Sequence, residues 1–317
     1  MIEAVLFFIF LQNRIVAEDY FHMSVEEKRG AYLTAWTTTR EERVISLLEE
    51  TDINTLVIDV KDFSGKVFFD TLSHSFLREL SDRGIYLIAR VTVFQDPLFA
   101  LQRSDLAIKN KDGSLWEDRL GLYWIDPAAR ESWEYYAQIA QRSLDYGFHE
   151  VNFDYIRFPS DGDLSSAVYP FWDGKSRREV IKSFYAYLRS NVDGKISASL
   201  FGLTTVARND LGIGQVLEDA LPYFDYISPM VYPSHYASGF LGKENPALYP
   251  YEVVYYSLAR ARERGNGAKI RPWLQDFNMG AVYGKEEVYL QIKAVRDALG
   301  EDYEGYLLWN SINMYTR

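Results

Sequence analysis

A carboxylate set into an apolar segment is the feature of the sequence best suited to chemistry. Asp154 lies between Phe153 and Tyr155 in the run 150–158, and a second acid, Asp276, ends the segment 270–276. A buried carboxylate is costly unless it has a partner. Glycoside hydrolysis needs two carboxyl groups beside the scissile bond: one protonates the leaving oxygen, and the other attacks the anomeric carbon or activates water. The pattern therefore predicts a glycosidase site with Asp154 and Asp276 as the catalytic pair.

Polar and aromatic side chains also collect near the carboxyl ends of the predicted strands. Trp273 and Trp309 would form an apolar floor for a sugar ring, since sugars stack on aromatic faces. Tyr232 and His235 could donate hydrogen bonds to sugar hydroxyls, and Arg157 could steer a carboxylate or lower its pKa. The predicted substrate-binding residues are Asp59, Lys61, Arg90, Asn152, Arg157, Tyr232, His235, Trp273, Gln275, Trp309 and Asn310.

Each of these residues also has a purely structural interpretation. Asp154 could form a salt bridge with Arg157 or Lys61 that holds the fold together. Asp59 and Lys61 alternate on one strand face, and they could form an internal ion pair that positions Asp154. Asp276 could cap a turn, the two tryptophans could be core residues, and His235 could be structural. The fallback choices for the second carboxylate are Asp59, Asp62 and Asp96.

Eight short apolar or β-branched runs alternate with amphipathic helical patterns along the chain. Several helical patterns end at a glycine, which relieves the left-handed geometry that follows a helix. This alternation predicts right-handed crossovers and a parallel sheet, and eight repeats favour closure into a barrel. The predicted strands are 30–34, 55–62, 86–94, 150–158, 195–202, 226–232, 270–275 and 305–310. The predicted helices are 41–50, 75–83, 130–146, 177–191, 251–264 and 285–299.

The fold expected from these elements is α/β, a single (β/α)₈ TIM barrel over residues 29–317 after an apolar segment over residues 1–28. Active sites in such barrels lie at the carboxyl ends of the strands. Two long connections, 95–126 and 233–250, leave strands at that face. Loops of this length are usually functional, so we expect both to overhang the site. The sequence marks no clear helix between the fifth and sixth strands.

Composition and charge narrow the function classes. The chain has 317 residues, a net charge of −11, and 16% aromatic residues. An acidic surface disfavours nucleic acid, whose binding needs clustered lysine and arginine, whereas a neutral carbohydrate partner is not penalised. There is no cysteine, and the four histidines are scattered. We therefore expect no cofactor and no metal site, which argues against a metal-dependent deacetylase.

The N-terminal run 4–11 is apolar but too short to span a bilayer. It fits the core of a signal peptide, although the preceding residues lack basic side chains. A truncated export signal would place the protein outside the cytoplasm or on the cell surface. The alternative is a helix packed under the barrel, which would be consistent with a cytoplasmic protein. In either case we expect no integral membrane span.

The segment 153–162, Phe-Asp-Tyr-Ile-Arg-Phe-Pro-Ser-Asp-Gly, resembles the signature of the bacterial putative glycoside hydrolase domain family, in the TIM-barrel glycosidase superfamily. The resemblance continues through 57–62, 88–97, 228–236, 272–277 and 307–310, and covers about residues 29–315. It implies a barrel with the site at its carboxyl face and a carbohydrate substrate.

The chain departs from characterised relatives of that superfamily. A chitinase-like fourth strand would end in a catalytic glutamate, and the nearby position here is Ile156. An amylase-like fifth strand would carry an acid, and the run 197–201 has none. Two hypotheses follow: a glycosidase that acts through Asp154 and Asp276, or a catalytically silent barrel that binds glycan, such as a cell-wall polymer. A barrel fold alone does not decide between them.

Overall fold

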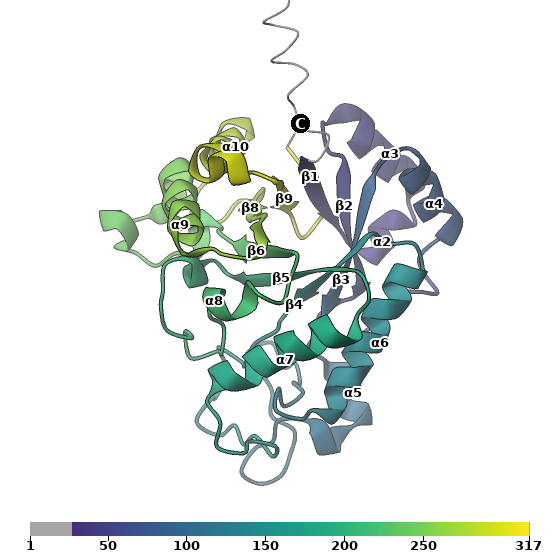
Figure 1. The fold of residues 1–317 in the computed structure, drawn as a ribbon, viewed down its shortest axis with the longest axis vertical. Coiled ribbons are helices and arrows are strands. Elements are labelled where there is room, and N and C mark those ends of the chain that lie inside the picture. Colours follow the sequence, from purple (N-terminus) through teal and green to yellow (C-terminus); the bar gives the residue numbers. More distant parts are fainter. Residues whose placement is uncertain (1–26, 317) are drawn as a thin grey trace, which may run out of the picture.

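The structure is a computed structural model, and it describes residues 27–316. Within that range the strands form one closed parallel barrel, drawn in Figure 1. The order β5-β4-β3-β2-β1-β9-β8-β6 closes through the pairing of β5 with β6. The strands are β1 (Lys28–Leu33), β2 (Thr55–Lys61), β3 (Tyr86–Thr92), β4 (Glu150–Asp154), β5 (Lys195–Phe201), β6 (Tyr226–Met230), β7 (Lys269–Ile270), β8 (Trp273–Gln275) and β9 (Gly305–Trp309). The predicted TIM barrel is confirmed.

The seventh barrel strand is interrupted. Its two pieces, β7 and β8, both pair with β6 and are separated by Arg271 and Pro272. Proline has no N–H to give to a strand ladder, which explains a break at this position. The Pro272 carbonyl still accepts a hydrogen bond from the backbone N–H of Leu307, so the segment stays in the barrel wall.

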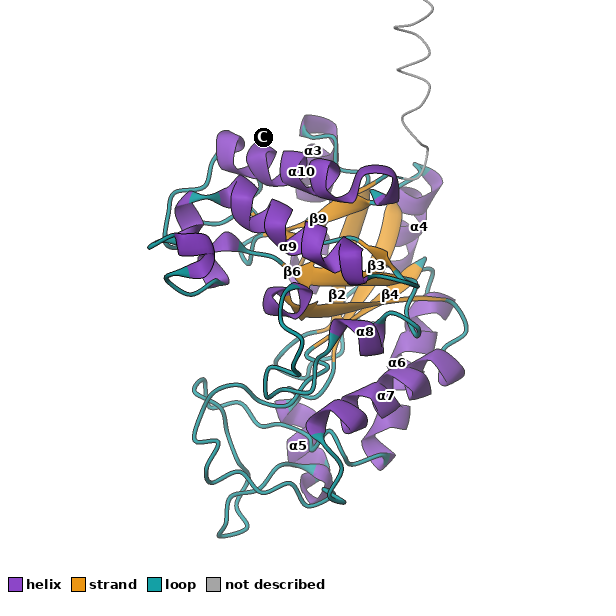
Figure 2. Ribbon diagram, turned by 60° about the vertical axis from the view of Figure 1, so that its left-hand side comes forward, coloured by secondary structure: helices purple, strands orange, loops and turns teal. Residues whose placement is uncertain are grey.

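Helices cover the outside of the barrel, between consecutive strands (Figures 1 and 2). The α-helices are α2 (Ala35–Thr38), α3 (Glu41–Glu50), α4 (His74–Asp82), α5 (Pro97–Gln102), α6 (Glu131–Asp145), α7 (Arg177–Asn191), α8 (Leu217–Ala220), α9 (Pro250–Arg264) and α10 (Lys285–Leu299). Short 3₁₀ turns lie at 104–106, 202–205, 233–235, 240–242, 246–248 and 300–302. All six predicted helices are present within a residue at each end. The poorly marked connection between the fifth and sixth strands contains the 3₁₀ turn at 202–205 and one short α-helix, the four-residue α8.

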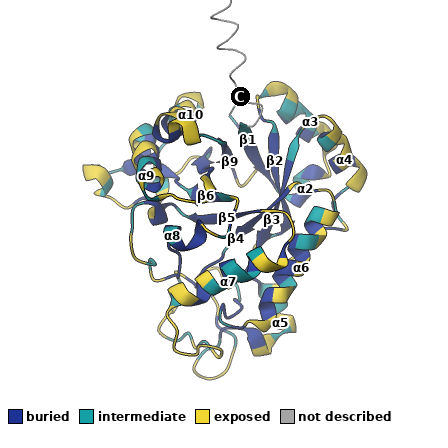
Figure 3. Cartoon of the chain, viewed as in Figure 1, coloured by how far each residue is buried: buried dark blue, intermediate teal, exposed yellow. Residues whose placement is uncertain are grey.

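The main core lies between the strands and the inner faces of the helices, which are dark blue in Figure 3. A second, smaller cluster fills the barrel interior near its carboxyl end. Its buried members are Tyr32, Val57, Ile88, Tyr232, Trp273 and Leu307. Filling the interior with side chains from alternate strands is the usual way that such barrels become solid. This cluster packs beneath the polar groups of the candidate site.

The two longest connections leave the barrel at the carboxyl ends of β3 and β4. They form the teal loops at the lower end of Figure 2, beside α5. A short antiparallel bridge between Lys109 and Val168 joins the two connections, and another between Gln95 and Trp124 lies within the first of them. The Trp116 indole N–H donates to the Asp163 carbonyl at 2.8 Å. The connection 95–126 is therefore packed against neighbouring segments and is not an extended loop without contacts.

Residues 1–26 of the expected N-terminal segment 1–28 lie outside the described residues, so the expectations about an export signal or a covering helix stay predictions. None of the helices in residues 27–316 has both the length and the hydropathy that are needed to span a membrane.

Candidate active site

A cavity of about 410 Å³ opens at the carboxyl ends of the barrel strands. This is the face at which barrel enzymes place their chemistry, and the volume falls in the range of small-ligand sites. Ionisable groups and aromatic rings from β3 to β9 line it. The lining residues are Arg90, Asp154, Tyr155, Arg157, Phe201, Gly202, Leu203, Met230, Tyr232, His235, Tyr236, Trp273 and Trp309.

Asp154 is the last residue of β4, and its carboxylate is held at both oxygens. Oδ1 accepts the backbone N–H of Tyr155 at 2.7 Å. Oδ2 accepts two N–H groups of Arg90, from Nε at 3.1 Å and from Nη2 at 2.8 Å. All three partners are donors, which is the geometry expected around an ionised carboxylate. The side chain is 9% exposed, and it reaches solvent through the cavity.

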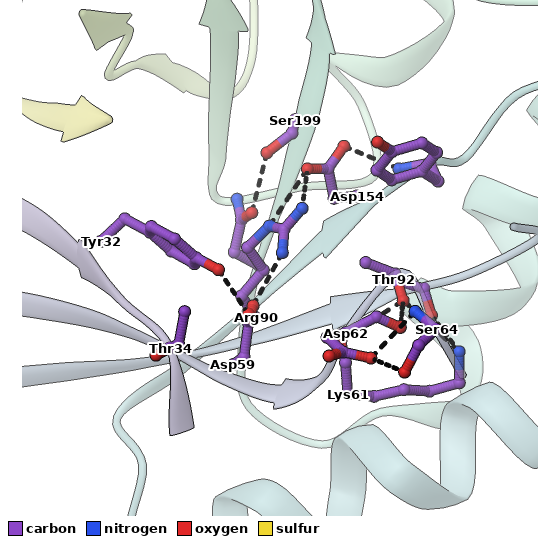
Figure 4. Close-up of polar contacts among 12 residues, drawn as sticks. Tyr32, Thr34, Asp59, Lys61, Asp62, Ser64, Arg90, Thr92, Asp154 and Ser199 are labelled. Carbon is purple, nitrogen blue, oxygen red and sulfur yellow. Dashed lines mark hydrogen bonds and ion pairs between the residues drawn. The ribbon is translucent and has the colours of Figure 1, made fainter. Parts of the chain in front are cut away.

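Arg90 bridges two carboxylates inside the barrel. Its Nη1 lies 2.7 Å from Oδ1 of Asp59, while Nη2 binds Asp154. Figure 4 shows the guanidinium between the two acids, with the Tyr32 hydroxyl directed at the far side of Asp59. That hydroxyl donates to Oδ2 of Asp59 at 2.6 Å. The strand register explains the arrangement, because Asp59 on β2 pairs directly with Arg90 on β3.

In this bridge, burial and ion pairing shift the pKa values of Asp59 and Arg90 in opposite directions. Burial raises the pKa of Asp59, and the Arg90 guanidinium and Tyr32 hydroxyl oppose it only in part. Burial acts to lower the pKa of Arg90, but Asp59 and Asp154 outweigh it and raise that pKa well above its ordinary value. Burial and the neighbouring Asp59 carboxylate also raise the pKa of Tyr32. Arg90 is therefore a fixed cation, and Tyr32 is a fixed hydrogen-bond donor.

The backbone turns sharply directly after Asp154. Tyr155 has a φ of +56°, in the left-handed region that non-glycine residues rarely adopt. This turn directs the Tyr155 N–H back at the Asp154 carboxylate. Strained backbone persists where the surroundings enforce it, and it is common at functional sites. Here the backbone N–H of Val93 holds the turn from β3 by binding the Asp154 carbonyl at 2.9 Å.

Two tryptophans, Trp273 and Trp309, line the cavity side by side. Trp309 stacks on Tyr32 with ring centroids 4.0 Å apart, and Arg90 lies 5.0 Å from the Trp309 ring. Trp273 stands nearly perpendicular to Trp309, and its indole N–H donates to Ser199 at 2.9 Å. Trp273 is only 1% exposed, whereas Trp309 is partly open. Of the two tryptophans, Trp309 is thus the one whose ring a ligand can reach.

Tyr232 and His235 face the cavity from the connection after β6. Their rings pack edge to face at 5.1 Å. Burial lowers the pKa of His235 and raises the pKa of Tyr232 well above its ordinary range. Near neutral pH the imidazole is therefore uncharged and the phenol keeps its proton. Both side chains suit the predicted role as hydrogen-bonding partners of hydroxyl groups.

Five predicted substrate-binding residues are absent from the cavity lining: Asp59, Lys61, Asn152, Gln275 and Asn310. Lys61 is fully buried and pairs with Asp96 at 2.9 Å, because a register shift after Asp59 turns it away from the bridge. Asn152 is occupied inside the barrel, where its amide donates to Ser197 and accepts from Ser199. Gln275 is also fully buried, and its amide donates to the Phe277 carbonyl and accepts the backbone N–H of Ser234.

Asp276 and Asn310 organise the C-terminal segment. The Asp276 carboxylate accepts the Thr316 hydroxyl at 2.6 Å and the Thr316 backbone N–H at 2.8 Å. The Asn310 amide donates to the carbonyls of Asp276 and Met314. Neither residue lines the cavity, so the structure does not bring the predicted second carboxylate beside Asp154.

The fallback acids have structural roles as well. Asp62 caps its own turn by accepting the N–H and hydroxyl of Ser64, and Asp96 caps α5 in addition to pairing with Lys61. The salt-bridge partner suggested for Asp154 was wrong: it is Arg90, rather than Lys61 or Arg157. Asp59 likewise pairs with Arg90 and not with Lys61.

Several lining residues were not singled out from the sequence: Tyr155, Phe201, Gly202, Leu203, Met230 and Tyr236. Gly202 carried a usable signal, since a glycine at a strand end often marks a close approach. A Cβ there would lie 2.4 Å from the Met230 carbonyl oxygen and 2.8 Å from the Tyr236 hydroxyl. Any larger residue would therefore push into the cavity wall. Among residues 27–316, no group of three acidic or histidine side chains is placed to hold a metal.

Comparison with known proteins agrees with this architecture. Residues 30–315 match the family model described as "Putative glycosyl hydrolase domain", which confirms the resemblance. A hypothetical protein from Ruminiclostridium thermocellum is similar at 31% identity and a TM-score of 0.50, over 58% of this chain and 98% of that one. No curated protein sequence matches the chain.

Two solved glycoside hydrolases share the fold. The glycoside hydrolase domain of PgaB from Bordetella bronchiseptica aligns at a TM-score of 0.64 and 13% identity, over 90% of this chain and 94% of that domain. An α-galactosidase from Thermus thermophilus aligns at a TM-score of 0.57 and 12% identity. The alignment covers 93% of this chain and 60% of that enzyme. At these identities the likeness shows the barrel fold.

Proposed function

The chain belongs to the family of putative glycosyl hydrolase domains, and on this premise we propose that it hydrolyses a glycosidic bond of an oligosaccharide or polysaccharide with Asp154 as the reacting carboxylate. The observation that carries the proposal is the fixed orientation of Asp154 at the mouth of β4. Three donors hold it, and the cavity lies in front of it. A carboxylate anchored in this way can attack an anomeric carbon or activate a water without first reorganising.

The cavity walls suit a sugar. Tyr32 and Arg90 pack on the Trp309 ring, and the part of the ring that stays exposed offers apolar surface to the C–H groups of a pyranose. Tyr232 and His235 supply hydrogen-bonding groups on another side of the same cavity. An apolar face with a few placed polar groups is the usual composition of a ligand site. This arrangement supports carbohydrate as the substrate class.

Departure of the leaving group needs a proton. Asp276 could supply this proton only if its hydrogen bonds to Thr316 broke, because both of its carboxylate oxygens accept hydrogen bonds from that residue. Among the lining residues, the side chains of Tyr232 and Tyr155 face the same space as Asp154 and keep their protons, because burial raises the pKa of both hydroxyls. The His235 imidazole also lines this space, but burial lowers its pKa, so it is uncharged near neutral pH. A protonated side chain within hydrogen-bond reach of the leaving oxygen is what general acid catalysis requires. The proposal therefore assigns the reacting carboxylate to Asp154 and the proton donor to one of these cavity groups.

A second candidate function is glycan binding without turnover. One observation favours it: Asp154 is the sole carboxylate among the described residues that line the cavity. Most glycosidases use two. A silent barrel would keep the aromatic wall and the hydrogen-bonding groups, and its Asp154 would serve to hold Arg90 in place.

A panel of polysaccharides separates these functions. Wild type is incubated with each glycan, new reducing ends are quantified, and binding is measured in parallel by affinity electrophoresis. The variant Asp154→Asn keeps the shape of the side chain but removes its charge. Asp126→Asn serves as a matched control, because Asp126 is buried and hydrogen-bonded outside the cavity. Hydrolysis that is lost only in Asp154→Asn supports the glycosidase. A glycan that wild type binds but never cleaves supports the silent barrel.

A further inference from the structure

Buried cations are rare in this chain, and one of them has no carboxylate partner. Among residues 27–316, the buried cationic residues are Lys61, Arg90, Arg157 and Arg271, and the side chain of Arg264 is also buried, where it pairs with Glu218. Lys61 pairs with Asp96, Arg90 with two aspartates, and Arg271 with Glu150. No acidic side chain of the described chain lies within 4.0 Å of Arg157 to pair with it. Burying a charge without a counter-ion is costly, so Arg157 requires a separate explanation.

Aromatic rings surround the Arg157 guanidinium. Its central carbon lies 4.9 Å from the Trp124 ring centroid, 5.1 Å from that of Tyr155 and 4.9 Å from that of Phe201. Each ring face attracts the cation, which offsets part of the cost of burial. The rings also hold the guanidinium plane in one orientation, which prepares it to bind a planar anion through two N–H groups.

The hydrogen bonds of Arg157 to the protein leave one edge of the guanidinium free. Nη1 donates to the Phe158 carbonyl at 3.1 Å and to the Ser160 hydroxyl at 3.2 Å. Nε and Nη2 have no acceptor among the described residues. Arg157 is 7% exposed, and it lines the same cavity as Asp154. The unused donors are thus within reach of a molecule bound there.

The electrostatics around Asp154 make such a cation useful. The bridge of Asp59, Arg90 and Asp154 contains two carboxyl groups and one guanidinium, so it has no net positive charge that could attract an anion. Burial lowers the pKa of Arg157 overall, although Tyr155, Asp154, Asp161 and Asp118 oppose this shift. A negatively charged substrate would therefore need a further cation within this cavity to attract it. Arg157 is placed to do so.

We propose that Arg157 is the anchor of an anion subsite, and that the sugar bound in the cavity carries a negatively charged substituent, either a carboxylate or a sulfate ester. The inference rests on the proposed function for the substrate being a carbohydrate, and it adds the charge class of that carbohydrate. The guanidinium edge formed by Nε and Nη2 would bind two oxygens of the anion, while Asp154 faces the scissile bond.

Matched probes that differ only in charge test this subsite. The pairs are oligogalacturonides and their methyl esters, hyaluronan oligosaccharides and their methyl esters, and sulfated and unsulfated cello-oligosaccharides. Binding is measured by calorimetry at one fixed ionic strength. The first two pairs report a carboxylate and the third reports a sulfate. We expect wild type to bind at least one charged member about tenfold or more tighter than its neutral twin, as charge-assisted hydrogen bonds allow.

Two variants assign that preference to Arg157. Arg157→Met keeps an apolar chain among the rings and removes the cation, and we expect it to bind both members of each pair equally. Arg157→Lys keeps the charge but loses the planar fork, so it should retain part of the preference and serves if the methionine variant does not fold. Arg177→Met is the control, because Arg177 packs over Phe158 and Trp172 outside the cavity. It should behave as wild type.

The inference is overturned if no charged probe binds wild type, or if the preference survives in Arg157→Met. Its failure can be told apart from failure of the proposed function. Hydrolysis of a neutral glycan that depends on Asp154, without binding of any charged probe, keeps the glycosidase and removes the subsite. Charge-selective binding that depends on Arg157, without hydrolysis of any glycan, keeps the subsite and removes the glycosidase.

Discussion

The substitution Arg90→Met removes the cation that holds two buried carboxylates. Arg90 lies 2.7 Å from Asp59 and 2.8 Å from Asp154, and all three side chains are nearly inaccessible. Removing one partner of a buried ion pair costs about 3–5 kcal/mol, because the remaining charge is left without compensation. Two carboxylates are orphaned here, so we expect a loss of unfolding free energy near the upper end of that range. A second substitution, Asp59→Asn, should recover part of the loss.

The loss should also depend on pH. Burial already raises the pKa of Asp59, and Arg90 opposes that rise in wild type. Without Arg90 the folded state binds more protons than the unfolded state over a wider range, and its stability falls as pH rises. The gap between Arg90→Met and wild type should therefore be largest at pH 7–8 and should shrink as pH falls toward about 4, the ordinary pKa of aspartate.

Urea unfolding followed by tryptophan fluorescence at several pH values measures this gap. Arg83→Met is the matched control, since the Arg83–Glu79 pair is half exposed and should contribute at most about 1 kcal/mol at any pH. A gap for Arg90→Met of about 1 kcal/mol or less that stays constant with pH would refute the buried bridge.

Three further substitutions have distinct expected outcomes. Trp309→Ala removes the open ring face and should weaken glycan binding about threefold to tenfold in a titration, whereas unchanged affinity would remove it from the site. Asp276→Asn disturbs the hydrogen bonds to Thr316 and should cost about 1 kcal/mol in urea unfolding while hydrolysis stays within about threefold of wild type. A large loss of turnover would instead restore the catalytic pair expected from the sequence. Lys61→Met should cost about 3–5 kcal/mol by orphaning Asp96, with no change in glycan affinity at the pH of the assay; a neutral effect on unfolding would contradict the buried pair.

The elements of the barrel could be predicted from the sequence because their signals are local. Helical periodicity with glycine stops placed the helices 177–191 and 285–299 at the residues where the structure has them. Apolar runs placed every barrel strand, although several predicted strands extended too far at their carboxyl ends. The fourth strand was predicted to continue to residue 158, so the turn at Tyr155 was missed. Residue type gives no sign of a left-handed backbone at a tyrosine.

The partners within the site depend on register and on long-range contacts, which a single sequence does not specify. Asp59 meets Arg90 because β2 and β3 pair at that residue, and Lys61 turns away because the register shifts directly after Asp59. The Asp276 carboxylate accepts a hydrogen bond from Thr316, which lies forty residues later in the sequence. The residue types were therefore sufficient to place Asp154 at the working end of the barrel, but not to choose between its charged neighbours.

The most direct test of the central claim is the turnover number of Asp154→Asn on a glycan that wild type cleaves, measured together with its affinity for that glycan. The isosteric amide keeps the cavity shape but cannot act as nucleophile or base, so we predict a fall in kcat of about 10²–10⁴-fold with affinity within about threefold. A variant that turns over within about tenfold of wild type while binding normally would contradict the assignment of Asp154 as the reacting carboxylate.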